Sequence, residues 1–545
     1  MSDVVAGLGA FTRRHLPLVL IALLACAFLS LGAIEAWRDS PTFDEPVYVS
    51  SGLTTLLRGE LSLNDEHPPL AKVLDVLPVL LVHPPIPINR RPGTNDEHSY
   101  SAAFLRAQIH AGTLRAVDFA SRIVPLLESV ALALLLYALA SDLYGAPAGC
   151  LSAALWLASP LVLGLGHLDG VDMPFALAVV GFSWTLTRWM RSRSRRRLLI
   201  LGVVAGIAAL TNASGLLIVA LGVIVVPALE IGHGRRRAAR AGLTFALAAL
   251  ASIWLVYIAL DPAVLGAGAD LLPHPYLEGL RYLSSHDTSP TPSYLAGVAW
   301  TGGRWWYWPL SLAVKLPPAT VAVLLLGPLG LVGLDRARRR EVAIVAALPA
   351  IVLFAFDLSL SRDIGVRYLL PVVALWLVVA SAAATRSRIR TVLALLVAAV
   401  GLGVWAMAAS FPHSLSWTDP VFGAPYQAAT NSSVDWGQDL FGLQRWDRAH
   451  LTRVAYFGPR GITPADTGQA APLIGVAPAR ITGWVAASAT DLTTVASLAW
   501  LRAYCPVGSI GATILIYHFA RPPSALAGPD KPVSPCHGSV NSRKA

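Results

Sequence analysis

The stretch Leu198–Leu229, LLILGVVAGIAALTNASGLLIVALGVIVVPAL, decides how this chain is organised. It contains no charged residue, and arginines stand on both sides of it, at Arg195–Arg197 and at Arg235–Arg237. Short cytoplasmic loops of membrane proteins accumulate Lys and Arg. Both ends of the run are therefore expected on the same side of a membrane, so the run must cross an even number of times. The polar residues Thr211–Gly215 provide a break near its middle, and the sequence predicts two short, tilted spans here.

The composition of the whole chain agrees with a polytopic membrane protein. Of its 545 residues, 55% are hydrophobic and only 14% are charged, whereas soluble domains carry about 25% charged residues. The mean hydropathy is +0.59, and 42 Lys and Arg against 32 Asp and Glu give a net charge of +10. These values exclude a disordered chain, a collagen and a small disulfide-stabilised domain.

Nine other apolar runs have the character of membrane spans, for which about 20 mostly apolar residues are needed. The first, Leu16–Ile34, exceeds the roughly 7–15 apolar residues of a secretory signal, so we interpret it as a span that stays in the chain. The other eight are Ile123–Ala140, Ala148–Gly166, Met173–Thr187, Leu243–Leu260, Pro309–Leu334, Val342–Phe356, Tyr368–Ala384 and Val392–Ser410. Together with the two spans in Leu198–Leu229, they predict a plasma-membrane protein with about eleven crossings.

Clusters of arginine orient these spans. They recur at Arg13–Arg14, Arg188–Arg197, Arg235–Arg240, Arg336–Arg340 and Arg386–Arg390. Each cluster alone fits a solvated face, but their recurrence between spans favours cytoplasmic loops. The N-terminus is then inside and the C-terminus outside. One loop departs from the rule, because the turn around Asp142 should be cytoplasmic but contains no basic residue.

This topology predicts a membrane domain and a smaller outer domain. The membrane domain covers residues 1–410 and has two large extracytoplasmic loops, 35–119 and 261–308. Residues 411–520 contain the strand-like runs Val454–Phe457, Ile481–Val485 and Thr513–Tyr517, which indicate a small α/β domain outside the membrane. Residues 521–545 are expected to be a disordered tail.

Two acidic motifs in the first outer loop are candidates for chemistry. Asp44-Glu45 follows the first span directly, where a carboxylate pair is costly unless it is solvated or engaged. The alternative is a solvated helix cap, because Asp is common at helix starts. Glu66-His67-Pro68-Pro69 follows, and it precedes an apolar helix, Leu70–Leu81, that is too short to span and should lie along the interface.

A metal site and a disulfide were also considered from the residue types. Glu66, His67, His83 and His98 contain possible ligands, but they show no recognised ligand spacing, so neither a metal nor another cofactor is expected. Cys26 and Cys150 lie inside apolar runs and are expected to be inert thiols. Cys505 and Cys536 are the cysteines expected outside the membrane, and a disulfide between them is a hypothesis.

Several motifs resemble one family of membrane enzymes. The acidic pair and the Glu66–Leu70 motif look like those of the protein O-mannosyltransferase and aminoarabinose-transferase superfamily, glycosyltransferase family 39 and its relatives, which have the GT-C fold. More of the chain is similar to a bacterial branch, the phospholipid-carrier-dependent glycosyltransferases. The matching segments, in order, are 120–125, 166–174, 305–317, 363–371, 431–440, 455–458 and 506–511.

The resemblance implies a cell-envelope glycosyltransferase with a GT-C-like membrane domain. It implies inverting transfer of a sugar from a polyprenyl-phosphate donor to an acceptor hydroxyl on the extracytoplasmic face. The catalytic residues would be Asp44, as general base, and Glu45. The donor-binding residues would be Glu66, His67, Arg122, Asp172, Lys315, Arg367 and Tyr368. The physical requirements agree, because the acceptor hydroxyl must lose a proton and the leaving lipid phosphate needs cations.

Other functions stay open at this stage. A transporter or flippase for lipid-linked sugars would have charged residues deep in several spans and repeated halves, whereas the acids here are expected at outer helix ends. A non-catalytic anchoring subunit would tolerate changes at Asp44. Nucleic-acid binding is not expected, because topology already explains the arginine clusters. Membrane lipids are expected partners, and the acceptor, whether protein, lipid or glycan, is left open, as is the sugar.

Overall fold

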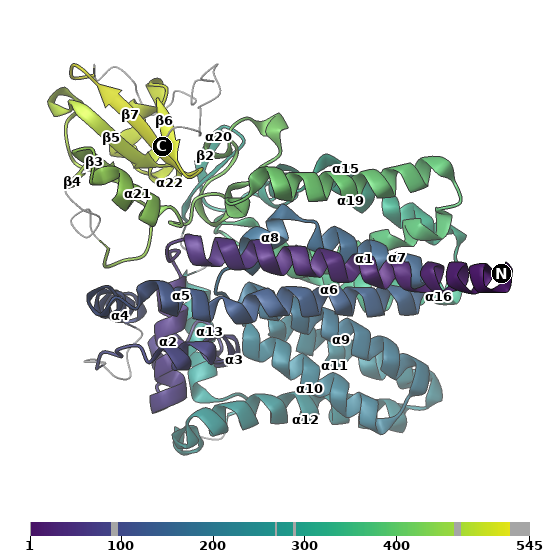
Figure 1. Cartoon of the computed structure of the whole chain (residues 1–545). Coiled ribbons are helices and arrows are strands. Elements are labelled where there is room, and N and C mark those ends of the chain that lie inside the picture. Colours follow the sequence, from purple (N-terminus) through teal and green to yellow (C-terminus); the bar gives the residue numbers. More distant parts are fainter. Residues whose placement is uncertain (1, 89–95, 268–269, 287–289, 463–469, 524–545) are drawn as a thin grey trace.

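The long helices of the protein lie side by side in one bundle. The computed structural model describes residues 2–88, 96–267, 270–286, 290–462 and 470–523. The helix α1 runs through the middle of the bundle in Figure 1, with α6 beside it and α9 to α12 below. The bundle helices are α1 (Ser2–Arg38), α5 (Leu114–Ser121), α6 (Ile123–Tyr144), α7 (Ala146–Leu157), α8 (Pro160–Gly166), α9 (Asp172–Ser192), α10 (Arg195–Thr211), α11 (Gly215–Glu230), α12 (Arg235–Leu260), α14 (Tyr307–Lys315), α15 (Pro318–Leu326), α16 (Arg336–Val342), α17 (Leu348–Asp357), α18 (Leu370–Ala380) and α19 (Arg390–Ser410).

Within the described residues, six helices are long and apolar enough to cross a membrane, or up to seven if the bent pair α7–α8 counts as one span. The sequence predicted about eleven crossings. Of the remaining predicted spans, Met173–Thr187 lies in the continuous 21-residue helix α9, which is not among the six, and the others are formed by shorter or broken helices. Proline explains one such break, because Pro317 and Pro318 separate α14 from α15 and proline lacks the backbone N–H that a helix interior needs. The number and the orientation of the crossings stay predictions.

The predicted break inside Leu198–Leu229 is confirmed. Helix α10 ends at Thr211 and α11 begins at Gly215. Asn212 stabilises the turn, because its Oδ1 accepts a hydrogen bond of 2.9 Å from the Ser214 backbone N–H. A Cβ at Gly215 would lie 2.1 Å from the carbonyl oxygen of Ala208. The turn therefore requires glycine at this position for steric reasons.

The turn around Asp142 contacts arginines from two of the clusters. The Asp142 carboxylate is 3.1 Å from Nε of Arg188 and 3.8 Å from NH1 of Arg191. Arg338 donates to the Asp142 carbonyl oxygen at 3.3 Å and pairs with Glu341 at 2.7 Å. A loop without a basic residue of its own is thus charge-compensated by its neighbours, which explains the departure from the arginine pattern.

Shorter elements gather at the opposite end of the bundle (Figure 1). They are α2 (Glu45–Arg58), α3 (Pro69–Asp75), α4 (Glu97–Ala111), α13 (His274–His286) and the antiparallel hairpin β1 (Pro292–Leu295) and β2 (Val298–Thr301). The helix expected at Leu70–Leu81 is divided in two. It ends at Asp75 and continues as a 3₁₀ helix, Pro78–Val82, because the residue before a proline disfavours the helical conformation.

The C-terminal part forms a small domain around a five-stranded sheet, at the same end of the bundle. Its strands are β3 (Thr452–Ala455), β4 (Ala471–Pro472), β5 (Gly483–Ser488), β6 (Gly508–Ile510) and β7 (Ile514–Phe519), in the order β4-β3-β5-β7-β6. The strand β3 is parallel to β4 and β5, and β7 is antiparallel to β5 and β6. Helices α21 (Leu440–Asp447) and α22 (Ala489–Thr494) accompany it. The three predicted strand runs overlap β3, β5 and β7 with ends displaced by up to two or three residues.

The described cysteines follow the expected division. Cys26 and Cys150 are free, and Cys505 is disulfide-bonded. Its expected partner Cys536 and most of the expected tail lie outside the described residues, so the Cys505–Cys536 pairing stays a prediction.

Candidate active site

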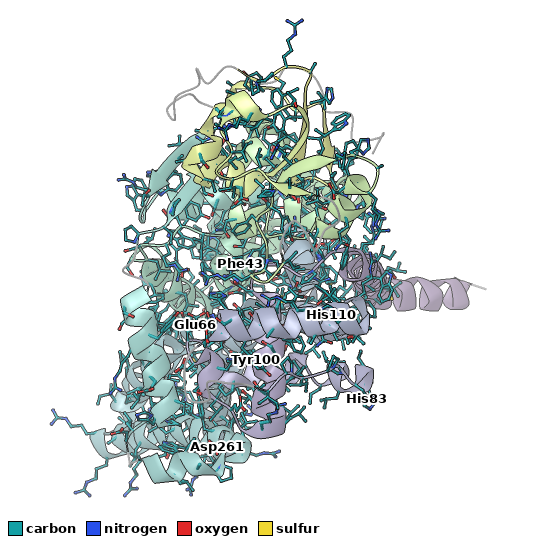
Figure 2. All side chains as sticks on the ribbon, turned by 90° about the vertical axis from the view of Figure 1, so that its left-hand side faces the viewer. Phe43, Glu66, His83, Tyr100, His110 and Asp261 are labelled. Carbon is teal, nitrogen blue, oxygen red and sulfur yellow. The ribbon has the colours of Figure 1, made fainter. Side chains whose placement is uncertain are left out.

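The loop before α2 is fixed by a segment from the far end of the sequence. The Ser40 backbone N–H donates to the Gln438 carbonyl at 3.0 Å, and that of Phe43 donates to the Trp436 carbonyl at 2.9 Å. The Ser40 hydroxyl also donates to the Gly437 carbonyl at 2.8 Å. Figure 2 shows Phe43 between α4 and the C-terminal domain. The position of the acidic pair thus depends on residues about 400 positions later in the chain.

Glu45 and Arg122 form a buried ion pair behind this loop. Nε and NH2 of Arg122 donate to the two carboxylate oxygens of Glu45 at 2.7 and 2.6 Å. The remaining N–H groups donate to the carbonyls of Ala36, Asp39 and Ser40 at 2.7 to 3.0 Å. A guanidinium has five N–H donors, and all five are used here. Arg122 therefore anchors the loop, and this arrangement gives no support to the expected contact with a donor phosphate.

The Glu45 carboxylate accepts hydrogen bonds from other groups besides Arg122. Its carboxylate also accepts the backbone N–H groups of Thr42 and Asp169 at 2.7 and 2.9 Å. Burial raises the pKa of Glu45, but the Arg122 guanidinium and these hydrogen bonds outweigh burial and lower the pKa below its usual value. The Glu45 carboxylate therefore orients the start of α2.

Asp44 differs from Glu45 because its side chain faces an open cluster. Its Oδ2 lies 2.9 Å from NH2 of Arg367 and 3.4 Å from the Tyr48 hydroxyl, and 21% of the side chain is exposed. Asp44 occupies the N-cap position of α2, yet its side chain makes no capping hydrogen bond. The alternative that Asp44 serves as a helix cap is therefore not supported by the geometry.

Arg367 is the cation of the cluster. Besides Asp44 it faces Asp172, with 3.7 Å between NH1 and Oδ2. Its guanidinium lies over two aromatic rings, at 4.4 Å from the centre of Trp436 and 5.2 Å from that of Tyr368. Such cation–π contacts hold a guanidinium in place without using its N–H donors. Arg367 therefore has a fixed position and N–H groups directed to two carboxylates.

The second acidic motif adds an imidazole to the cluster. The His67 Nε2 lies 3.3 Å from Glu66 and 3.5 Å from the Tyr48 hydroxyl. Burial raises the pKa of Glu66, but the hydrogen bond and charge of His67, together with the charges of Arg362 and Lys72, outweigh burial and lower the pKa to about 2. Glu66 thus remains an anion beside the imidazole. The structure brings Asp44, Glu66 and His67 together, as the sequence predicted.

A buried polar network lies beside the Glu66-His67 motif. Lys72 donates to Oδ1 of Asn64 at 2.8 Å, and the Asn64 amide in turn donates to Glu97 at the N-terminal end of α4, close to Glu66 in Figure 2. Burial lowers the pKa of Lys72 to about 8. Burial and the nearby Glu66 charge raise the pKa of Glu97 to about 8, so Glu97 holds a proton at neutral pH.

Lys315 is placed away from the cluster. Its ammonium is buried and donates to the backbone carbonyls of Leu415, at 2.8 Å, and Trp417. These contacts tie the end of α14 to the segment that follows α19. The geometry supports an anchoring role for Lys315 and gives no support to the expected contact with the donor.

The carboxylates of the Asp435–Asp439 stretch are hydrogen-bonded to the C-terminal domain. Asp435 accepts the Thr490 backbone N–H at 2.8 Å, and Asp439 accepts the Thr513 hydroxyl at 2.7 Å. Burial raises the pKa of Asp435 to about 7. Both carboxylates therefore hold this stretch against the C-terminal sheet and α22.

Two residues of the cluster were missed by the sequence reasoning. Tyr48 lies one helical turn after Asp44, and the spacing i, i+4 on a helix would have identified it as a neighbour. Trp436 comes from a segment to which no role was given, and no local signal indicates its contact with Arg367. Among the described residues, no three His, Cys, Asp or Glu side chains are arranged to hold a metal ion.

Comparison with known families agrees with the motifs. Residues 105–259 match the family model described as dolichyl-phosphate-mannose-protein mannosyltransferase. This region, which is less than a third of the chain, is therefore similar to the protein O-mannosyltransferase type of glycosyltransferase. The matched region of this type holds Arg122 and Asp172, and the recognition made from the sequence is confirmed. A search among curated proteins found no match.

Solved structures of similar membrane enzymes were also found. ArnT from Cupriavidus metallidurans bound to undecaprenyl phosphate is 15% identical with a TM-score of 0.48, and the match covers 72% of this chain and 64% of that one. AglB from Archaeoglobus fulgidus, in complex with an inhibitory peptide and a dolichol-phosphate, is 10% identical with a TM-score of 0.46 and coverages of 93% and 74%. The Saccharomyces cerevisiae Pmt1-Pmt2 complex bound to the sugar donor is 17% identical with a TM-score of 0.31 and coverages of 45% and 33%. The chain thus spans less than two thirds of the length of the matched ArnT.

Proposed function

We propose that the protein transfers a sugar, with inversion, from a polyprenyl-phosphate donor to an acceptor hydroxyl at the extracytoplasmic face of the plasma membrane. The observation that carries this proposal is the pairing of a partly exposed carboxylate, Asp44, with a fixed cation, Arg367, at 2.9 Å. Such a pair supplies the two groups that the reaction needs. One accepts the proton of the acceptor, and the other compensates the charge of the departing phosphate.

The chemical step assigns one role to each group. The acceptor oxygen attacks the anomeric carbon and gives its proton to Asp44, which acts as general base. The bond between that carbon and the phosphate oxygen breaks, and its electron pair leaves with the polyprenyl phosphate. Arg367 compensates the charge that develops on the phosphate. Before the reaction the phosphate competes with Asp44 for the guanidinium, and this frees the carboxylate to act as a base.

The neighbouring residues position these two groups. Tyr48 lies between Asp44 and His67, with its hydroxyl 3.4 and 3.5 Å from them. We assign His67 and Glu66 to contacts with the hydroxyl groups of the sugar, and Asp172 to holding Arg367. We propose that no metal or other cofactor is required.

We propose the following domain organisation for this activity. Residues 1–410 form the membrane catalytic domain with outer loops 35–119 and 261–308, residues 411–520 form the outer domain, and residues 521–545 are the tail. The gathering of α2, α3, α4, α13 and the sheet at one end of the bundle supports a site on one face of the membrane (Figure 1). The arginine clusters support the assignment of that face to the outside.

The direct test is consumption of the donor. Purified full-length protein would be incubated with a panel of radiolabelled polyprenyl-phosphate sugars and with a membrane extract as the source of acceptor. Release of polyprenyl phosphate with transfer of the label from one donor, and its loss in Asp44→Asn, is the expected result. Movement of lipid-linked sugar across vesicles without bond cleavage would overturn the proposal in favour of a transporter.

A further inference from the structure

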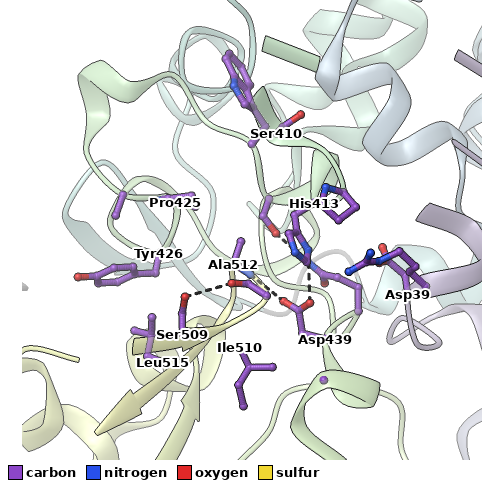
Figure 3. A pocket seen from close by; sticks show the side chains of 18 of the residues that line it. Asp39, Ser410, His413, Pro425, Tyr426, Asp439, Ser509, Ile510, Ala512 and Leu515 are labelled. Carbon is purple, nitrogen blue, oxygen red and sulfur yellow. Dashed lines mark hydrogen bonds and ion pairs between the residues drawn. The ribbon is translucent and has the colours of Figure 1, made fainter. Parts of the chain in front are cut away.

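A large cavity lies on the other side of the loop that carries the acidic pair. Its volume is about 1640 Å³, and it is enclosed by the outer ends of α1, α5 and α19, by the segment 410–450 and by the turn between β6 and β7. Figure 3 shows His413 facing Asp439 in this cavity, with Asp39 beside them and Ser509 to Ala512 contributed by the sheet. The cavity is therefore built by membrane helices and the outer domain together.

The cavity is separate from the Asp44 cluster. Asp39 and Gln438 line it, and both belong to the paired segments that hold the acidic loop. Trp436, two residues before Gln438, covers Arg367 in the Asp44 cluster. The paired segments thus form a wall with the candidate active site on one side and the cavity on the other.

The acidic side chains of the cavity are already engaged. Asp39 lies 3.1 Å from Nε2 of the buried His167. Asp439 accepts hydrogen bonds from the Thr513 hydroxyl at 2.7 Å and from the Ala512 backbone N–H at 3.2 Å. Each carboxylate is turned into the protein, with an exposure of 6% for Asp39 and 7% for Asp439. Both carboxylates therefore make their contacts inside the protein, and they are outnumbered by the arginines that line the cavity.

Three arginines line the cavity without such compensation. They are Arg38 at the end of α1, Arg115 at the start of α5 and Arg445 on α21. Within the described ranges, none of the three forms a salt bridge, and Arg115 rests over the Phe441 ring at 4.1 Å. The cavity therefore carries a surplus of positive charge, which favours an anionic ligand.

One wall of the cavity continues into an apolar surface. Trp405 and Ala409 line the cavity from α19, and Trp405 is 57% exposed. Further along α19, Val397 and Leu393 are also exposed, at 64% and 48%. An exposed apolar face on a helix that is apolar enough to span faces lipid, and tryptophan is typical of the membrane interface. Arginines thus line one part of the cavity, and a helix that faces lipid lines another part.

We propose that this cavity binds the phosphate-bearing headgroup of an anionic membrane lipid. Arg38, Arg115 and Arg445 contact the phosphate, and the acyl or prenyl chains lie along α19 beside Trp405. Charge-assisted contacts between guanidinium groups and phosphate are strong and directional. The same chemistry is offered by a bilayer phospholipid and by a polyprenyl phosphate, and both are arms of the experiment. The site is independent of donor binding at Asp44.

The test measures lipid binding directly by native mass spectrometry of the full-length protein in detergent. The lipids are short-chain phosphatidylglycerol, phosphatidylcholine of the same chain length, and polyprenyl phosphate, and inorganic phosphate serves as a competitor. The variant R38Q/R115Q/R445Q is compared with R448Q/R480Q/R521Q, which removes the same charge from exposed arginines of the outer domain outside the cavity. Thermal unfolding checks the fold of both, and single Arg445→Gln replaces the triple variant if the latter is unfolded.

We expect phosphatidylglycerol or polyprenyl phosphate to bind at least about tenfold more tightly than phosphatidylcholine. That preference should be lost in the cavity variant and retained in the matched control and in Arg367→Gln, which removes the cation proposed for the donor centre. Whichever of the two anionic lipids binds more tightly identifies the source. Equal binding of phosphatidylcholine, or equal loss in both triple variants, would overturn the proposal, because the lipid would then be held by general hydrophobicity or by surface charge. Loss in Arg367→Gln would also overturn it, because Arg367 is the cation proposed to hold the phosphate at the donor centre, and the binding would then be assigned to that centre.

Discussion

The two carboxylates of the acidic pair should respond to mutation in opposite ways. In Asp44→Asn the shape of the side chain is kept and its capacity to accept a proton is lost. Turnover should fall by about 10²–10⁴-fold, the usual contribution of a positioned general base. Stability should change by about 1 kcal/mol or less, because the Asp44 side chain makes no capping hydrogen bond and its ion pair is partly exposed.

Glu45→Gln removes one partner of an ion pair in which the side-chain exposures are 0% for Arg122 and 2% for Glu45. Breaking such a buried pair costs about 3–5 kcal/mol, because the remaining charge is left uncompensated. We therefore expect a large loss of thermal stability, together with turnover in the folded fraction that is higher than that of Asp44→Asn.

The assay is single-turnover sugar transfer by detergent-solubilised variants, normalised to folded protein, with thermal unfolding measured in parallel. Transfer by Asp44→Asn near the wild-type rate would refute its assignment as the base. An unchanged melting temperature for Glu45→Gln would refute the anchoring role of the buried pair.

Four further results are expected. Reporter tags after Arg195 and Arg338 should be cytoplasmic and a tag after Ala428 extracytoplasmic; a cytoplasmic signal from the last would invert the topology. Lys315→Met should cost about 1–3 kcal/mol of stability, since two buried carbonyls lose their hydrogen-bond partner. The affinity of the folded fraction for the polyprenyl-phosphate sugar should be unchanged, and a weaker affinity would indicate that Lys315 contacts the phosphate. The pKa of Glu97 is raised by burial from 4.5 to about 8, so the folded state holds a proton that the unfolded chain releases, and stability should fall as pH rises from about 4.5 to 8; Glu97→Gln should flatten this part of the pH–stability curve, and an identical slope in both proteins would contradict the shift. Incubation with EDTA should leave turnover unchanged, and a loss that Mg²⁺ or Mn²⁺ restores would establish a metal requirement.

The bundle and the acidic cluster were predictable because their signals are local. The Thr211–Gly215 break appears as polar residues inside an apolar run, and the structure places the two helix ends there. Asp44, Glu66 and His67 lie within one loop region, so their proximity follows from short chain segments. The charge compensation of Asp142 was not predictable, because its partners Arg188 and Arg191 lie on another helix.

The roles of the cations could not be separated from the sequence. Arg122 and Arg367 have the same side chain and stand at comparable positions near outer helix ends. Arg122 uses all five donors inside the protein, whereas Arg367 directs its N–H groups to the two carboxylates of the cluster. The difference arises from tertiary packing, which brings three backbone carbonyls to one guanidinium and two aromatic rings to the other.

The pairing of Ser40 and Phe43 with the segment Trp436–Gln438 has a consequence for biosynthesis. Synthesis proceeds from the N-terminus at roughly 5–20 residues per second. The acidic loop is among the first segments synthesised, but the segment that fixes its backbone is made about 400 residues later, roughly 20–80 seconds afterwards at those rates. During this interval the nascent chain displays its carboxylates without the arrangement that directs Asp44 toward Arg367. The loop can therefore reach its final geometry only after synthesis has reached the last fifth of the polypeptide.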